Sequence, residues 1–214
     1  RIIGDAPGVV LESGEPVASA ELYVLVDVPL KATGTPANVP LRGVGVHAGS
    51  LRSGFRIIEG RTFRPGTREV IVGRGAALEN AGLEVGKQLR SGTQVWDIVG
   101  IFADSGSVAE SEIWSDAIVL QGAYNRGTSY QSTRVRLESP NAFAGFKDAL
   151  TSDPRLNVGV YTEREYYASQ SRALVTLVTV LGQTIAILMG LAAVFGALNT
   201  MYSAVSARTR EIAT

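Results

Sequence analysis

The side chains best suited to chemistry are one histidine and two neighbouring glutamates. His47 is the single histidine, and the chain has no cysteine that could complete a thiol or metal site. Glu110 and Glu112 could act as general acid and base. They fall in a polar stretch, 104–115, for which we expect a surface loop with both carboxylates in water.

A pair of glycines forms the other candidate site. Gly73-Arg74-Gly75 follows a predicted strand and precedes a predicted helix, as in a dinucleotide-binding turn. Leu78 stands where that turn needs its third glycine, so the pair predicts a plain turn. No phosphate-binding loop sequence occurs either. The sequence therefore predicts no catalytic, cofactor-binding or metal-binding residue, and a protein that is not itself an enzyme.

The balance of charged residues excludes nucleic-acid-binding proteins. Twenty basic and twenty acidic side chains cancel over 214 residues, and no Lys/Arg cluster stands out. Nucleic-acid binding depends on phosphate contacts from basic groups. Nucleic acid is therefore not an expected partner.

The first half of the chain predicts mainly strands. Leu22–Val28 is nearly all apolar and ends at Pro29, which predicts a strand buried on both faces, followed by a loop to Pro40. Within 41–103, strand signals recur at 42–46, 69–72 and 95–102, with one short helix at 76–81. We interpret 41–103 as a mainly β subdomain.

The segment 133–161 predicts a βαβ unit. Alternation at 134–138 indicates a strand, Ser139 and Pro140 can open a helix to Thr151, and alternation resumes at 156–160. The two strands are expected to be parallel. The predicted fold class is α/β: a split βαβ sheet with an inserted β subdomain, in a core domain over 1–172.

A stretch without charged side chains, Ala173–Ala207, follows this domain. A membrane-spanning helix needs about 20 apolar residues, so we predict a transmembrane helix over 173–201. Thr162 and Glu165 fit a capping box that starts a helix before the span, and no proline follows. A helix from 163 to 207 would measure about 67 Å, longer than a bilayer of roughly 40–45 Å. The surplus, 163–172, is expected to form a stalk.

Side chains on this helix suggest further contacts. A stripe of small residues can bring a second membrane helix close, although such residues are common in membrane helices anyway. Tyr166 and Tyr167, with Tyr202 at the other end, could mark the membrane interfaces or pack against protein. The stripe consists of Gly182, Ala186, Gly190, Ala193 and Ala197.

The last segment carries a resemblance. Arg208, Arg210, Glu211 and Ile212 form an Arg-x-Arg-Glu-Ile pattern directly after the span. The pattern resembles the segment after the second membrane helix in permease subunits of the MacB/FtsX superfamily of ABC transporters. Further segments follow in the order of that superfamily's periplasmic core domain: Gly60–Phe63, Glu69–Gly73, Leu83–Gly86 and Trp96–Phe102.

This resemblance implies a different location and role for each part of the chain. Residues 1–172 would be extracytoplasmic, on a bacterial inner membrane, and 202–214 would meet a separate cytoplasmic ATPase through the Arg208–Ile212 pattern. The permease would be a homodimer in the lipid bilayer, with one membrane helix before Arg1 and two after Thr214. Two alternatives stay open: Arg208 and Arg210 could only anchor the helix at headgroups, and the chain could be a membrane-anchored binding or sensory module without an ATPase.

Overall fold

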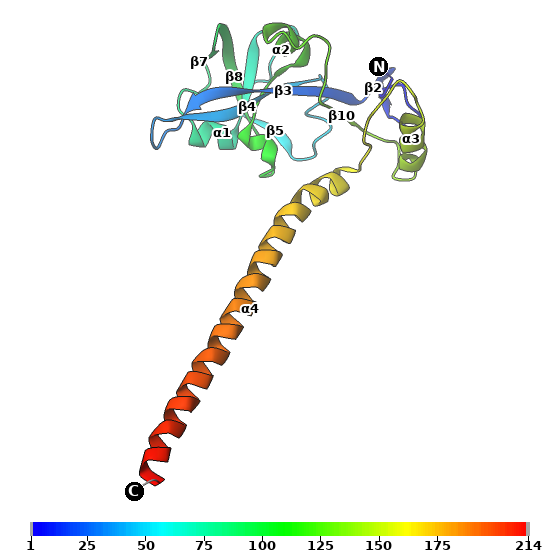
Figure 1. Cartoon of the computed structure of the whole chain (residues 1–214). Helices are drawn as coiled ribbons and strands as arrows, with labels where there is room; N and C mark the ends of the chain where they lie inside the picture. Colours follow the sequence, from blue (N-terminus) through cyan, green and yellow to red (C-terminus); the bar gives the residue numbers. More distant parts are fainter. Residues whose placement is uncertain (1, 213–214) are drawn as a thin grey trace. The chain divides into compact units, whose positions relative to one another are not determined.

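The computed structural model describes residues 2–212, of which 170–174 and 207–212 are described by their backbone alone. The chain divides between Val158 and Gly159 into two units, which are treated separately below. Figure 1 shows a sheet with short helices in the first unit and a single long helix in the second.

The first unit contains ten strands and four short helices among its described residues. The strands are β1 (Leu11–Glu12), β2 (Glu15–Pro16), β3 (Ala18–Pro29), β4 (Pro36–Val44), β5 (Phe55–Gly60), β6 (Glu69–Gly73), β7 (Gln88–Ser91), β8 (Gln94–Asp104), β9 (Ile113–Asp116) and β10 (Ser132–Val135). The helices are α1 (Arg74–Glu79), the 3-10 helix η1 (Val108–Ser111), α2 (Ala117–Ala123) and α3 (Ala142–Thr151).

Eight of these strands form one mixed sheet. Its order is β10-β3-β4-β9-β6-β8-β5, and β7 pairs with β8 beside β5. Only the β4–β9 and β6–β8 pairs are parallel. The mixed α/β class is thus confirmed. The strands of 41–103, however, share this sheet with β3, β9 and β10, so that segment does not form a separate sheet.

Alternate residues of the central strands supply two cores, because neighbouring side chains on a strand point to opposite faces. Val70 and Val72 enter one cluster with Leu120 of α2 and Ala76 of α1. Ile71, between the two valines, enters the other cluster with Trp114 and Phe102. The sheet is therefore covered on both faces at its centre.

From Tyr23 onward, the second face of β3 is open. Leu22, Val24 and Val26 are buried, whereas Tyr23 and Leu25 between them are about half exposed. The prediction of a strand buried on both faces was wrong here. Strand β4 also begins at Pro36, inside the predicted loop.

The predicted βαβ unit does not form. The first strand exists as β10, but it pairs antiparallel with β3, and no strand is present at 156–160. Val158 is 37 % exposed, so the alternation there reflects no buried face. Helix α3 does form, although it starts at Ala142 with Asn141 at its N-cap in place of Ser139.

The second unit is one helix, α4, that runs without a break over 50 residues from Glu163 to Ile212. Its start has reciprocal hydrogen bonds: the Thr162 amide donates to the Glu165 carboxylate (3.0 Å), and the Glu165 amide donates to the Thr162 hydroxyl (3.2 Å). This is the geometry of a capping box, which satisfies backbone donors that the first helical turn leaves unpaired.

Candidate functional site

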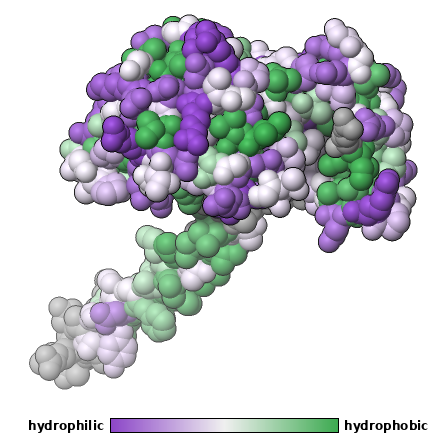
Figure 2. All heavy atoms as spheres, turned by 90° about the horizontal axis from the view of Figure 1, so that it is seen from above, coloured by the Kyte–Doolittle hydropathy of each residue, from purple (hydrophilic) through white to green (hydrophobic). Residues whose placement is uncertain are grey.

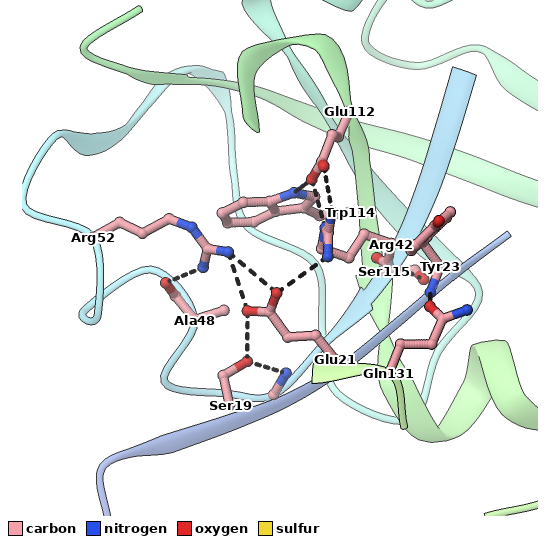
Figure 3. A network of polar contacts seen from close by, with 11 residues as sticks. Ser19, Glu21, Tyr23, Arg42, Ala48, Arg52, Glu112, Trp114, Ser115 and Gln131 are labelled. Atoms are coloured by element: carbon pink, nitrogen blue, oxygen red, sulfur yellow. Dashed lines mark hydrogen bonds and ion pairs between the residues drawn. The ribbon is translucent and has the colours of Figure 1, made fainter. Parts of the chain in front are cut away.

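The most concentrated polar cluster of the described chain lies on one face of the sheet (Figure 3). Glu21 from β3, Arg42 from β4 and Glu112 just before β9 meet Arg52, which comes from the turns between β4 and β5. We call these four residues, with Trp114, the ion network. It joins segments that are far apart in the sequence.

Glu21 is the centre of the ion network and is 1 % exposed. Its carboxylate accepts from Arg52 Nη2 (3.1 and 3.3 Å), from Arg42 Nη1 (3.4 Å) and from the Ser19 hydroxyl (3.2 Å). A buried carboxylate is tolerated only when its charge and its lone pairs are matched in this way.

Arg42 carries the second half of the network. Its Nε and Nη2 donate to the two Glu112 oxygens at 2.7 and 2.5 Å, a bidentate pair, and Trp114 Nε1 donates to Glu112 at 3.0 Å. Burial alone would lower the pKa of the Arg42 guanidinium. The hydrogen bonds to Glu112 and the attraction of Glu112 and Glu21 outweigh burial and raise that pKa.

Aromatic rings hold the other side of Arg52. Its guanidinium lies 4.4 Å from the centre of the Trp114 ring, within cation–π range. Trp114 in turn stacks on Phe55 at 5.4 Å and contacts Phe102 at 4.4 Å. Arg52 Nη1 also donates to the Ala48 carbonyl (2.9 Å), which ties its own turn to the sheet.

Glu110 forms a second, smaller cluster. Its carboxylate accepts from the amides of Gly106 and Asp104, both at 2.8 Å, and from Arg74 at 3.0 Å. The two amide bonds, followed by Arg74, lower the pKa of Glu110. The stretch 104–115 is therefore ordered structure, η1 and part of β9, and the prediction of two solvated glutamates was wrong.

These contacts indicate what the acids can do. Glu21, Glu110 and Glu112 each form an ion pair with an arginine, so their carboxylate oxygens are occupied by structural contacts. His47 lies in the turns after β4, where its carbonyl accepts from the Ser50 hydroxyl. Among the described side chains, no group of three His, Cys, Asp or Glu residues could hold a metal. The geometry is that of a cross-link between segments.

The glycine pair also has a packing role. A Cβ added at Gly73 would lie 2.2 Å from the Glu110 carbonyl oxygen, and one at Gly75 would lie 3.0 Å from it. The chain thus brings the start of α1 against η1, which leaves the pair in contact with backbone.

The predicted membrane residues all lie on α4. Val175–Ser206 is the one described stretch long and apolar enough to span a bilayer, with mean hydropathy 2.1 and no burial. Figure 2 shows the hydrophobic side chains along it. Gly182, Ala186, Gly190, Ala193 and Ala197 are all exposed there. Arg208, Arg210, Glu211 and Ile212 fall outside the described side chains.

The sequence interpretation missed the ion network. Its one signal was Glu21, a carboxylate inside the apolar alternation of β3. Neither Arg42 nor Arg52 stands out by spacing, because both reach Glu21 from other segments.

Known proteins resemble this chain in sequence and in fold. The family model of the MacB-like periplasmic core domain matches residues 5–153. That range covers most of the first unit, including every strand of the sheet. A comparison with curated proteins finds no match.

Two solved structures share the fold. The extracellular domain of the noncanonic ABC-type transporter YknZ from Gram-positive bacteria is similar with a TM-score of 0.53 and 18 % identity, over 70 % of this chain and 76 % of that one. The periplasmic region of MacB from Actinobacillus actinomycetemcomitans is similar with a TM-score of 0.52 and 14 % identity, over 70 % of each chain.

The family match and the apolar helix α4 together indicate a membrane-anchored protein with an extracytoplasmic domain. The sheet described above is that domain, and its polar clusters hold it together. The chain belongs to the family of MacB-like periplasmic core domains, which are parts of ABC transporter permeases.

Proposed function

We propose that this chain is the part of a permease that links an extracytoplasmic domain to a separate cytoplasmic ATPase. Residues 1–172 would lie outside the inner membrane, α4 would cross it, and 202–214 would contact the ATPase. The permease would act as a homodimer, and ATP hydrolysis would belong to the partner subunit. Its role is movement of the outer domain, for export or for transmission of force.

The observation that carries this proposal is the unbroken course of α4. At about 1.5 Å per residue, 50 residues measure about 75 Å, against roughly 40–45 Å for a bilayer with its headgroups. A helix held by backbone hydrogen bonds at every turn transmits displacement and rotation between its ends. The capping box at Thr162 and Glu165 supports the same role, because it prevents fraying at the outer end.

The inner end supplies the contact with the ATPase. Met201, Val205, Arg208 and Ile212 follow one another at offsets of four, three and four, so they share one side of α4. An apolar edge with one guanidinium fits a groove on a partner protein. Arg210 and Glu211 would then face other sides, available for charged contacts at the rim.

The experiment inserts seven residues after Ala168, in the outer part of α4. One variant receives a helix-forming, alanine-rich insert and its matched control receives a Gly/Ser insert of the same length. Seven residues keep the helical phase to within about 20°, so the helical insert preserves the connection. The measurement is the ATP-dependent signal of a fluorescent probe on the outer domain, in permease reconstituted with its ATPase.

We expect the helical insert to keep most of the ATP-dependent signal and the Gly/Ser insert to lose it. An equal signal from both inserts would contradict a mechanical role of α4. Failure of the unmodified chain to bind any ATPase would favour the membrane-anchored sensory module instead.

A further inference from the structure

The edge of β3 that faces away from β4 is paired at both of its ends. Antiparallel strands exchange hydrogen bonds at every second residue, and in β3 the odd-numbered residues face this edge. Strand β10 pairs antiparallel with Ala18–Glu21. At the other end, the Ala81 amide donates to the Pro29 carbonyl (2.8 Å). The Lys31 amide beside it donates to the Glu79 carbonyl (2.9 Å), and this segment is also antiparallel.

Between these two segments the edge of β3 is open. The Gln131 carboxamide oxygen accepts from the Tyr23 amide (2.7 Å), as the carbonyl of a neighbouring strand would do. Beyond it, the Tyr23 carbonyl and both backbone groups of Leu25 and Asp27 have no hydrogen bond among the described residues. We call this stretch, Tyr23–Asp27, the β3 gap. It presents two amide donors and three carbonyl acceptors along one line, and the β3–β4 register beside it has no bulge.

The side chains at the β3 gap indicate what kind of segment it fits. Tyr23 and Leu25 are 42 % and 57 % exposed, and Tyr130, next to Gln131 in the chain, is exposed as well. Asp27 is exposed and shares their face of the sheet, because alternate residues of a strand point to the same side. Natural sheets protect a free edge with lysines, bulges or prolines. Strand β3 has none of these until its last residue, so its edge is left available for pairing.

We propose that the β3 gap binds an extended segment of another protein on the extracytoplasmic side, which adds as a short strand antiparallel to β3. Main-chain hydrogen bonds at a sheet edge provide affinity in such complexes, and alternate side chains provide specificity. The added strand would run in the same direction as both flanking segments. The register then specifies its side chains: a basic one opposite Asp27, followed at every second position by apolar ones opposite Leu25 and Tyr23.

The size of the gap argues against a second copy of this chain as the occupant. Strand β3 is 12 residues long. Two copies paired about Leu25 would bring Pro29 of one copy opposite Glu21 of the other, where β10 already lies. The opposite edge strand, β5, has a register shift between Ile57 and Glu59, which makes it a poor match for a regular edge. A short segment that leaves the edge at both ends avoids these conflicts. The proposal concerns the first unit alone and is independent of α4 and the ATPase.

The first experiment measures the binding of synthetic peptides to the whole chain in detergent micelles by fluorescence anisotropy. The probe is the labelled peptide Thr-Lys-Thr-Val-Thr-Val-Thr, in which lysine and the two valines would lie opposite Asp27, Leu25 and Tyr23. N-methylation of the first valine removes the donor to the Leu25 carbonyl and should weaken binding about tenfold. N-methylation of the next threonine, whose amide would point away from β3, is the matched control and should change binding little. Equal affinities of the two methylated peptides would overturn the proposal.

The second experiment changes the protein. Leu25→Pro removes a donor that the β3–β4 ladder does not use, so it should abolish peptide binding while the sheet stays intact. Asp27→Lys should weaken binding about two- to fivefold and should favour a peptide with glutamate in place of lysine. Ile58→Lys, on β5 at the other edge, is the control and should bind the original peptide normally. Normal binding by Leu25→Pro, or an unchanged charge preference of Asp27→Lys, would contradict the assignment.

The same variant distinguishes another protein from a second copy. Sedimentation of the whole chain with and without Leu25→Pro reports whether the β3 gap joins two copies. We expect the same oligomeric state for both chains. A dimer that Leu25→Pro dissociates would make a second copy the occupant and would overturn the assignment to another protein.

Discussion

At the scale of single residues, this domain depends on charges that are buried and matched. The ion network consists of four charged side chains and one indole, and both of its carboxylates are less than a tenth exposed. Such ion pairs add little net stability compared with apolar residues. A buried charge nevertheless destabilises the folded state strongly when its partner is removed. Their effect is therefore best seen by deleting one member.

Glu21→Gln should destabilise the domain by about 3 kcal/mol, because it leaves the Arg52 guanidinium buried without its counter-charge. The measurement is the free energy of unfolding in urea, followed by Trp fluorescence. Glu84→Gln is the control, since it breaks an exposed pair with Lys87 and should change stability little. Similar free energies of unfolding for both variants would show that Arg52 does not depend on Glu21 as its counter-charge.

A second residue-scale prediction concerns acid. The Arg61 hydrogen bonds, at 2.6 and 2.7 Å, are the main cause that lowers the pKa of Glu69 from 4.5 to about 2. A carboxyl with a lowered folded-state pKa contributes stability above pH 4.5, and that contribution is lost as pH falls toward 2.

Glu69→Gln should therefore be less stable than the original chain at pH 6, and the difference should shrink on acidification to pH about 2. Unfolding in urea at several pH values measures it. Glu15→Gln, at an exposed acid of β2, controls for the loss of one charge. A difference that grows on acidification would contradict the assignment.

At the scale of elements, the close approach of α1 and η1 sets a strict condition on Gly73. Gly73→Ala should cost about 1–3 kcal/mol, because its methyl group would meet the Glu110 carbonyl. Gly145→Ala is the matched control: it lies exposed within α3 with nothing inside 4 Å and should stabilise by about 0.5–1 kcal/mol. Thermal unfolding of both variants shows whether each substitution raises or lowers stability. A stabilised Gly73→Ala variant would disprove the contact.

The helices and strands also show how much of the fold could be predicted from the sequence. Strands β6 and β8, helix α3 and the continuous α4 could be predicted, because local periodicity, turns and caps determine them. Strand β9 could not, since its four residues are too short for a pattern and are all buried by tertiary packing. The alternation at 156–160 misled for the converse reason: no strand pairs with it, and none of its three apolar side chains is fully buried. The ion network could not be assembled from its one sequence signal, Glu21, because its members converge from four segments.

At the scale of the whole molecule, the proposal predicts that the inner end of α4 controls the ATPase. Arg208→Glu combined with Ile212→Asp should abolish coupling between ATP hydrolysis and the outer domain, because it reverses the charge and removes the apolar contact. Arg208→Lys with Arg210→Lys preserves anchoring at headgroups and serves as control. The measurement is ATPase binding and hydrolysis by purified complexes. Normal values in the reversed variant would leave these arginines as membrane anchors.

Strand β10 pairs with β3, which precedes it by more than a hundred residues, and this has a consequence for how the chain folds. Strands β3 and β4 are neighbours along the chain and can form a hairpin early, but the outer edge of β3 at Ala18–Glu21 is paired only when β10 arrives. The Gln131 side chain that accepts from the Tyr23 amide comes 108 positions later. Such distant pairing slows folding. During synthesis β3 therefore presents an unpaired edge for as long as a hundred residues take to emerge, which makes this the period when aggregation competes most strongly with folding.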